Sequence, residues 1–129
     1  MVVSAGGQDQ LLVSASFKVF EEAPEDVVRT LELAGLKSRA KGSDRFSTPA
    51  HVIRVDDPIE RDKHFTSTVE GLFQILTEGA ANVGADLDSS GVHLYVSLSN
   101  SSGVASFMLG PEVWAPWAQV NATLRVDVI

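Results

Sequence analysis

The side chains best suited to binding chemistry form a short run of cations in an otherwise acidic chain. A turn permitted by glycine can present cations and backbone N–H groups together, so this run is a candidate site for an anion or for an acidic patch on a partner. The alternative is a solvated loop that balances nearby acids, because exposed ion pairs contribute little to stability. The run surrounds Gly42 and consists of Lys37, Arg39, Lys41 and Arg45.

A second pair of candidate residues, His93 and Tyr95, lies in a segment that alternates apolar and polar side chains. Residues two apart on a strand share a face, so the two rings are expected side by side. They form either one wall of a binding groove or an exposed pair at a sheet edge. We place both residues with the four cations as candidates for contact with a partner or an anion.

The sequence contains no motif that specifies catalysis, a metal site or a cofactor. It has no cysteine, and its three histidines lack the spacings typical of metal ligands. There is no G-x-S-x-G nucleophile motif and no Gly-rich phosphate loop. The loop that begins at Asp86 resembles a calcium loop, but Ser97 stands where the bidentate Glu is needed. We therefore assign no catalytic residue, metal ligand or cofactor and favour a protein that is not an enzyme.

Charge argues against nucleic acid as a partner, because binding to phosphates depends on Lys and Arg. The 129 residues include 10 basic and 17 acidic side chains, a net charge of −7. Residues 1–64 hold nine of the basic and eleven of the acidic side chains, whereas residues 65–129 hold one and six. The second half is rich in Ser, Thr and Asn, and such a surface is easily desolvated. The alternative is a buried hairpin whose small polar residues cover its solvent-facing side. If the protein has a protein partner, the contact is expected first at residues 65–129.

Localisation is inferred from three features of the sequence. The opening segment lacks the basic start and the apolar run of a signal peptide. No apolar run approaches the length of a membrane-spanning helix. With no cysteine either, we expect a cytoplasmic protein that makes no contact with a membrane.

The first half of the chain predicts a flexible tail over residues 1–10, followed by a single domain over 11–129. Period-two alternation predicts a strand over 11–20. Pro24 is suited to a first helical position and Gly35 to a left-handed stop, so a helix is expected over 24–34. Residues 36–49 show no regular pattern, and a short strand is expected over 51–55.

The second half predicts the longest helix, which starts either at Asp57-Pro58 or at a second capping box near Ser67 and ends near Ala80. A β-hairpin is expected from strands 92–99 and 104–109, joined by the turn 100–103. A short helix follows from Gly110-Pro111, limited by Pro116. It carries Trp114 and Trp117 on one side, either as core residues or as an aromatic contact surface. A last strand is expected over 122–128.

These elements predict an α+β fold with the order β-α-β-α-β-β-α-β. A two-layer sandwich, with the helices on one face of a mostly antiparallel sheet, buries their apolar sides. A ferredoxin-like variant with one added βα element is the expected topology.

In their order, several segments resemble a bacterial family of uncharacterised small α+β domains. These segments are Ala15-Ser16-Phe17-Lys18-Val19-Phe20, the helix that starts at Pro24, Arg39-Ala40-Lys41-Gly42, Phe107-Met108-Leu109 and the closing strand Leu124-Arg125-Val126-Asp127-Val128. The chain departs from the family where Ser43 follows Gly42 in place of Asp, and where no Trp occurs before His51. The resemblance implies an α+β fold and a bacterial origin but no established activity. Some relatives are regarded as immunity-type partners of toxins.

Three functional hypotheses follow. The first is a non-enzymatic binding protein, of the immunity type if the resemblance extends to function, whose acidic surface steers it to a basic partner. The second is a small-ligand module or enzyme with a site between the helices and the sheet. The third is a homo-oligomer joined through the low-charge hairpin at residues 92–109.

Overall fold

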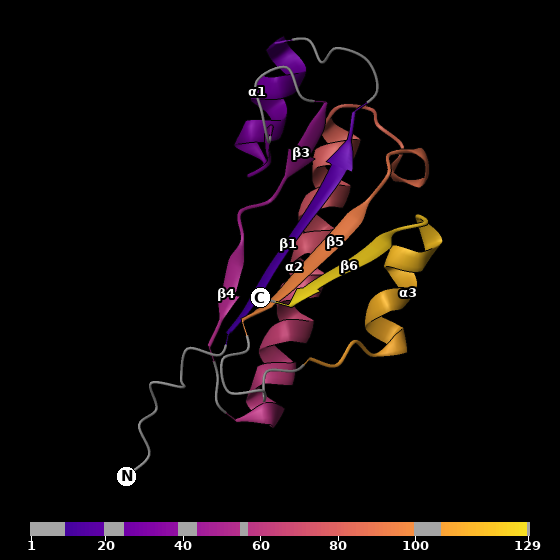
Figure 1. Ribbon diagram of the computed structural model, residues 1–129. Coiled ribbons are helices and arrows are strands. Elements are labelled where there is room, and N and C mark those ends of the chain that lie inside the picture. The colour runs from indigo at the N-terminus through magenta and orange to yellow at the C-terminus, as the bar shows by residue number, and fades with distance from the viewer. Residues whose placement is uncertain (1–9, 20–24, 39–43, 55–56, 100–106, 129) are drawn as a thin grey trace.

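The computed structural model of the chain describes residues 10–19, 25–38, 44–54, 57–99 and 107–128 (Figure 1). The predicted tail lies outside the described residues except for Gln10, which begins the first strand. The basic residues Arg39 and Lys41 also lie outside them.

β1 (Gln10–Lys18) is the central strand of the sheet and confirms the strand predicted over 11–20. Its alternation buries Leu11, Val13, Ala15 and Phe17 completely on one side. On one edge it pairs antiparallel with β5 (His93–Ser99) along nearly its whole length. On its other edge it pairs antiparallel with two short strands, so both edges of its backbone are hydrogen-bonded.

Those short strands, β3 (Arg45–Ser47) and β4 (His51–Ile53), are separated by a bulge. The register of the two strands against β1 differs by one residue, which is the extra residue typical of a β-bulge. Between the two strands, Thr48 continues the bonding to β1. Its backbone N–H donates to Ala15 O at 2.9 Å, and its Oγ1 accepts from Ala15 N at 3.0 Å. Only β4 was predicted. β3 and the two-residue β2 (Lys37–Ser38) fall in the stretch that showed no pattern.

Two helices confirm their predictions. α1 (Glu25–Leu33) ends before Gly35, whose φ of 93° is the left-handed stop. α2 (Pro58–Asn82) starts at the first of the two predicted points, where Asp57 Oδ1 accepts from Ile59 N at 3.2 Å. The loop after α2 forms a short 3-10 turn, η2 (Leu87–Ser89), capped by the Asp86 carboxylate.

The predicted hairpin over residues 92–109 is wrong in its pairing. β5 is bordered by β1 on one edge and by β6 (Thr123–Val128) on the other, so no edge is left for a returning strand. Residues 107–109 are not in a strand, and 100–106 lie outside the described residues. The chain instead crosses over through α3 (Pro111–Gln119) and returns as β6, parallel to β5.

Helix α3 extends through Pro116, which was expected to limit it. A proline in a short helix removes one hydrogen bond, and packing of Trp117 offsets that loss. Trp117 is fully buried, lies 5.0 Å from the Phe73 ring between centroids, and stacks with Trp114 at 6.1 Å. The prediction that both tryptophans point to the same side is confirmed, and Trp117 is a core residue.

The described residues form an α+β fold, with three α-helices on a mixed sheet of six strands in the order β2-β3-β1-β5-β6, in which β4 also pairs with β1. α1 and α3 both contact α2, and all three helices cover the same face of the sheet (Figure 1). The core lies between these two layers. Among the described helices, none is both long and apolar enough to cross a membrane.

Two glycines of α2 allow the packing of this core to be tested. A Cβ on Gly79 would lie 2.5 Å from Leu36 Cδ1, whereas a Cβ on Gly71 would meet nothing within 4 Å. We expect Gly71→Ala to raise the free energy of unfolding by about 1 kcal/mol, the usual gain of alanine over glycine in a helix. Gly79→Ala should lower it by about 1 kcal/mol or more, because Leu36 is fully buried and has little room to move. Urea unfolding followed by circular dichroism measures both values, and shifts of the same sign would contradict this packing.

Candidate functional site

The sheet face opposite the helices carries most of the polar side chains of the strands, together with the apolar pair Leu12 and Val52, which lie opposite each other. The registers of four strand pairs place one row of such residues straight across the sheet, and a second row lies beside it. The first row is Lys37, Ser47, Ser16, His93 and Thr123, and the second is Ser14, Tyr95 and Arg125. We call this surface the open face.

Ser16, Tyr95 and His93 of the open face form a connected chain with Arg45, which lies two residues from Ser47 on the same side of β3 and so belongs to the open face as well. We call this chain the Arg45–His93 network. Arg45 Nη1 donates to Ser16 Oγ at 2.9 Å. Ser16 Oγ lies 3.5 Å from Tyr95 Oη, which in turn lies 2.9 Å from His93 Nδ1. Ser16 is fully buried and the other three are half-buried. The network therefore joins three adjacent strands, β3, β1 and β5.

The groups involved limit the directions of these hydrogen bonds. A guanidinium can only donate, so the Ser16 oxygen accepts from Arg45 and can pass its own hydrogen to Tyr95. The 2.9 Å contact between Tyr95 Oη and His93 Nδ1 is shorter than the 3.5 Å contact between Tyr95 Oη and Ser16 Oγ. Its direction depends on the tautomer of His93: Tyr95 donates when the ring hydrogen is on Nε2, and the ring donates when the hydrogen is on Nδ1.

Arg45 is held in place from a second direction. Its Nη1 also donates to the backbone carbonyl of Gly91, at 3.0 Å. Gly91 has a φ of 55°, and a Cβ there would approach Arg45 Nη2 to 3.4 Å. The guanidinium thus bonds both to Gly91, just before β5, and to Ser16, near the end of β1.

The six predicted site residues are only partly brought together. Arg45, His93 and Tyr95 join in the network. Lys37 lies on the same face on the neighbouring strand β2, diagonal to Arg45 and exposed. Arg39 and Lys41 lie outside the described residues. Just beyond the network, Lys18 pairs with Asp44 at 3.3 Å.

Sequence reasoning missed Ser16, the residue that connects Arg45 to the two rings. Its only signal was its place on the polar side of the first strand, which it shares with Ser14 and Lys18. The choice among these residues depends on the cross-strand register, in which Ser16 lies opposite both Ser47 and His93. A single sequence does not contain that register.

The space between helices and sheet offers less support for a site. His93 and Tyr95 point away from it, and buried side chains such as Phe17, Phe65 and Trp117 fill it. A groove of about 400 Å³ lies between α2 and α3, where Glu70 and Glu112 flank Phe73 and Trp117. No residue of the Arg45–His93 network lines it.

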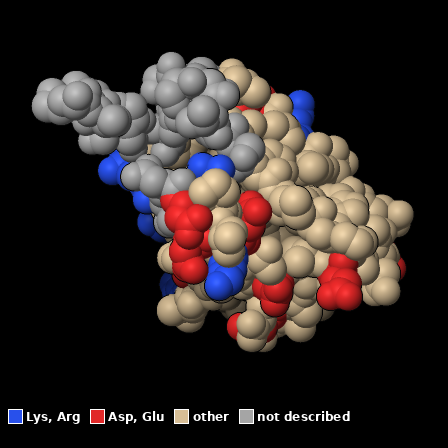
Figure 2. All heavy atoms as spheres, turned by 90° about the horizontal axis from the view of Figure 1, so that it is seen from below, with Lys and Arg blue, Asp and Glu red and all other residues tan. Residues whose placement is uncertain are grey.

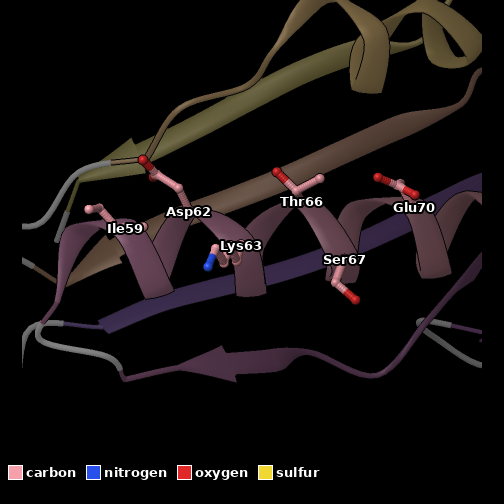
Figure 3. Close-up of a pocket in the computed structure, with 6 residues that line it drawn as sticks. All are labelled: Ile59, Asp62, Lys63, Thr66, Ser67 and Glu70. Carbon is pink, nitrogen blue, oxygen red and sulfur yellow. The ribbon is translucent and has the colours of Figure 1, made fainter.

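A second groove, of about 490 Å³, runs along the first half of α2 (Figure 3). Asp62, Thr66 and Glu70 follow one another along one side of the helix, while Lys63 and Ser67 point to the other side. These lining residues, with Ile59, all come from one helix. Such a surface lacks the converging groups from several elements that fix a ligand.

Within the described parts of the chain, no three His, Asp or Glu side chains gather where they could hold a metal ion.

Comparison with protein-family models finds no match, and comparisons with curated proteins and with solved structures find no significant similarity. The resemblance to a bacterial family stays a prediction that rests on the sequence segments quoted above.

Ser16 and Ser47 allow a matched test of the network, since they face each other on neighbouring strands. The Ser47 hydroxyl is buried and has no hydrogen-bond partner among the described residues. We expect Ser16→Ala to lower the free energy of unfolding by about 1 kcal/mol, because Arg45 and Tyr95 lose a shared partner. Ser47→Ala should leave stability unchanged or raise it by up to about 1 kcal/mol. Thermal and urea unfolding measure both, and equal losses would show that the Ser16 hydroxyl contributes nothing specific.

Proposed function

We propose that the protein is a non-enzymatic binding protein that presents its open face to a protein partner, with the Arg45–His93 network at the centre of the contact. The observation that carries this proposal is the network itself: Arg, Tyr and His side chains, held by one another, on a sheet face that the helices leave uncovered. Tyr and Arg are enriched among the residues that dominate binding energy. Because these side chains are already ordered, less conformational entropy is lost on binding.

The chemistry of the network favours a carboxylate group on the partner. A guanidinium matches a carboxylate in shape and charge. Around Arg45, Lys37 and Lys18 add positive charge on β2 and β1, and Asp44 offsets part of it. The net charge of −7 acts at longer range and favours approach by a basic partner. We propose a partner that is basic overall and places an acidic side chain against Arg45.

Charge is sparse on the part of the open face that β5 contributes. Figure 2 views the molecule from the end at which α2 begins, where acidic and basic side chains intermix. On the open face, β5 contributes His93, Tyr95 and Ser97, none of them Lys, Arg, Asp or Glu. A sparsely charged surface is cheaper to desolvate, which supports a contact with a protein partner there.

An open sheet face supports binding better than catalysis, because it does not enclose a substrate and exclude water. The alternative, a small-ligand or enzymatic site between helices and sheet, has less support because the candidate residues lie on the other face. An immunity-type role against a toxin and a cytoplasmic location remain part of the proposal. They rest on the family resemblance and on the absence of cysteine.

We also propose that the fold is a ferredoxin-like variant. The order β2-β3-β1-β5 supports this, since each neighbouring pair is antiparallel and one helix precedes β2 and another precedes β5. α3 and β6 are then the added element.

The test compares two double variants that remove the same side-chain types. Arg45→Ala/His93→Ala changes the open face, and Arg29→Ala/His64→Ala changes exposed positions on α1 and α2. The tagged wild-type chain is used to purify its partner from the source organism, and affinity is then measured by calorimetry. We expect the open-face variant to bind about tenfold more weakly or worse, and the helix variant to bind like the wild type. A loss confined to the helix variant would overturn the proposal.

The immunity-type role has a separate readout. If the purified partner is a toxin, co-expression of the wild-type chain should restore growth of cells that produce it. The helix variant should protect equally, and the open-face variant should not. Circular dichroism of each variant confirms that both are folded.

A further inference from the structure

The strand β6 has an edge that no described strand covers. It pairs with β5 on one side and is the outermost strand of the sheet (Figure 1). Val126 and Val128 are 44% and 70% exposed, although both are large apolar residues. An exposed edge strand with apolar side chains is a template for pairing with another strand.

The backbone groups available at this edge can be assigned. Thr123 N donates to Val92 O at 2.9 Å, so the backbone of Thr123 faces β5. Successive residues of a strand turn their N–H and C=O groups to opposite edges. The outward groups therefore belong to Leu124, Val126 and Val128.

We propose that two copies of the chain associate through β6, antiparallel, about a twofold axis at Val126. Val126 then faces Val126 of the partner subunit, and Leu124 faces Val128 of the partner subunit. These are the residues with outward backbone groups, so each pair exchanges both of its N–H···O bonds. The pairing extends the sheet from one copy into the other.

Charge selects this register over its neighbours. With the axis at Val126, Arg125 lies opposite Asp127 of the partner subunit, and by symmetry this pair occurs twice. In an antiparallel sheet, the pairs between hydrogen-bonded ones bring side chains closest, which favours opposite charges there. An axis at Arg125 or at Asp127 would place like charges opposite each other. An axis at Leu124 would place Val128 opposite the end of α3, which is not a strand, so fewer residues of the two copies could pair.

The apolar side of the strand fits the same arrangement. Leu124, Val126 and Val128 lie opposite Leu94, Val96 and Leu98 of β5, so they point to the helix side of the sheet. Paired about Val126, the two strands would form one apolar stripe and cover the exposed valines. The proposed site of self-association is therefore β6, in place of the hairpin predicted over residues 92–109.

A twofold axis perpendicular to the sheet keeps the open faces of both copies on the same side. The dimer would carry two Arg45–His93 networks on one continuous surface. This inference does not depend on the proposed function, since it rests on β6 alone.

The first experiment is a charge exchange measured by sedimentation equilibrium up to about 1 mM chain, a range that captures weak dimers. We expect Arg125→Asp and Asp127→Arg, each alone, to raise the dimer dissociation constant about tenfold or more, because like charges then face each other. The double variant Arg125→Asp/Asp127→Arg should return to within about threefold of the wild type. Arg29→Asp, which reverses an exposed charge on α1, is the control and should have no effect.

The second experiment uses the absence of cysteine in the chain. Val126→Cys introduces a single thiol in each copy. In the proposed dimer the two thiols lie opposite each other across the axis, close enough to form a disulfide. Under mild oxidation it should form a covalent dimer. Val52→Cys, at a residue of similar exposure (50%) on β4, should stay monomeric. A wild-type chain that is monomeric throughout, or a dimer that ignores both charge reversals, would overturn the proposal.

Discussion

The position of every described strand depends, directly or through a neighbouring strand, on the backbone pairing of β1. It bonds to β3 and β4 along one edge and to β5 along the other, so it sets the register of the whole sheet. Its alternation separates two environments. Leu11, Val13, Ala15 and Phe17 enter the core under the helices, and Ser14 and Ser16 face the open side. The core and the candidate site are thus opposite faces of one strand, and a change of register by one residue would exchange them.

The same register explains how residues far apart in the chain form one network. Ser16 lies opposite Ser47 and His93, so Arg45 and Tyr95, each two positions along the neighbouring strands, both come within reach of its hydroxyl. Gly91 fixes the guanidinium from the end of the sheet. In the contact that we propose, side chains that are already ordered lose less conformational entropy on binding.

Much of this fold could be predicted from local patterns. The alternation of the first strand, the capping residues of α2 and the stop at Gly35 act over a few residues, so the sequence shows them directly. The hairpin prediction failed because alternation identifies a strand but not its partner; β5 takes β1 and β6 in place of its neighbour in sequence. β3 was too short to show a period. For the site, residue types indicated Arg45, His93 and Tyr95, while Ser16 emerged only from long-range pairing.

The hydrogen bonds on the open face run from Arg45 through Ser16 and Tyr95 to His93. The most direct measurement of their direction is the tautomer of the neutral His93 imidazole, read from long-range ¹H–¹⁵N correlation spectra. Because Ser16 can donate to Tyr95 and Tyr95 can donate onward, we predict that the hydrogen resides on Nε2, with Nδ1 accepting from Tyr95, and that Tyr95→Phe weakens this preference. A neutral ring protonated on Nδ1, or a tautomer ratio that Tyr95→Phe leaves unchanged, would contradict this prediction.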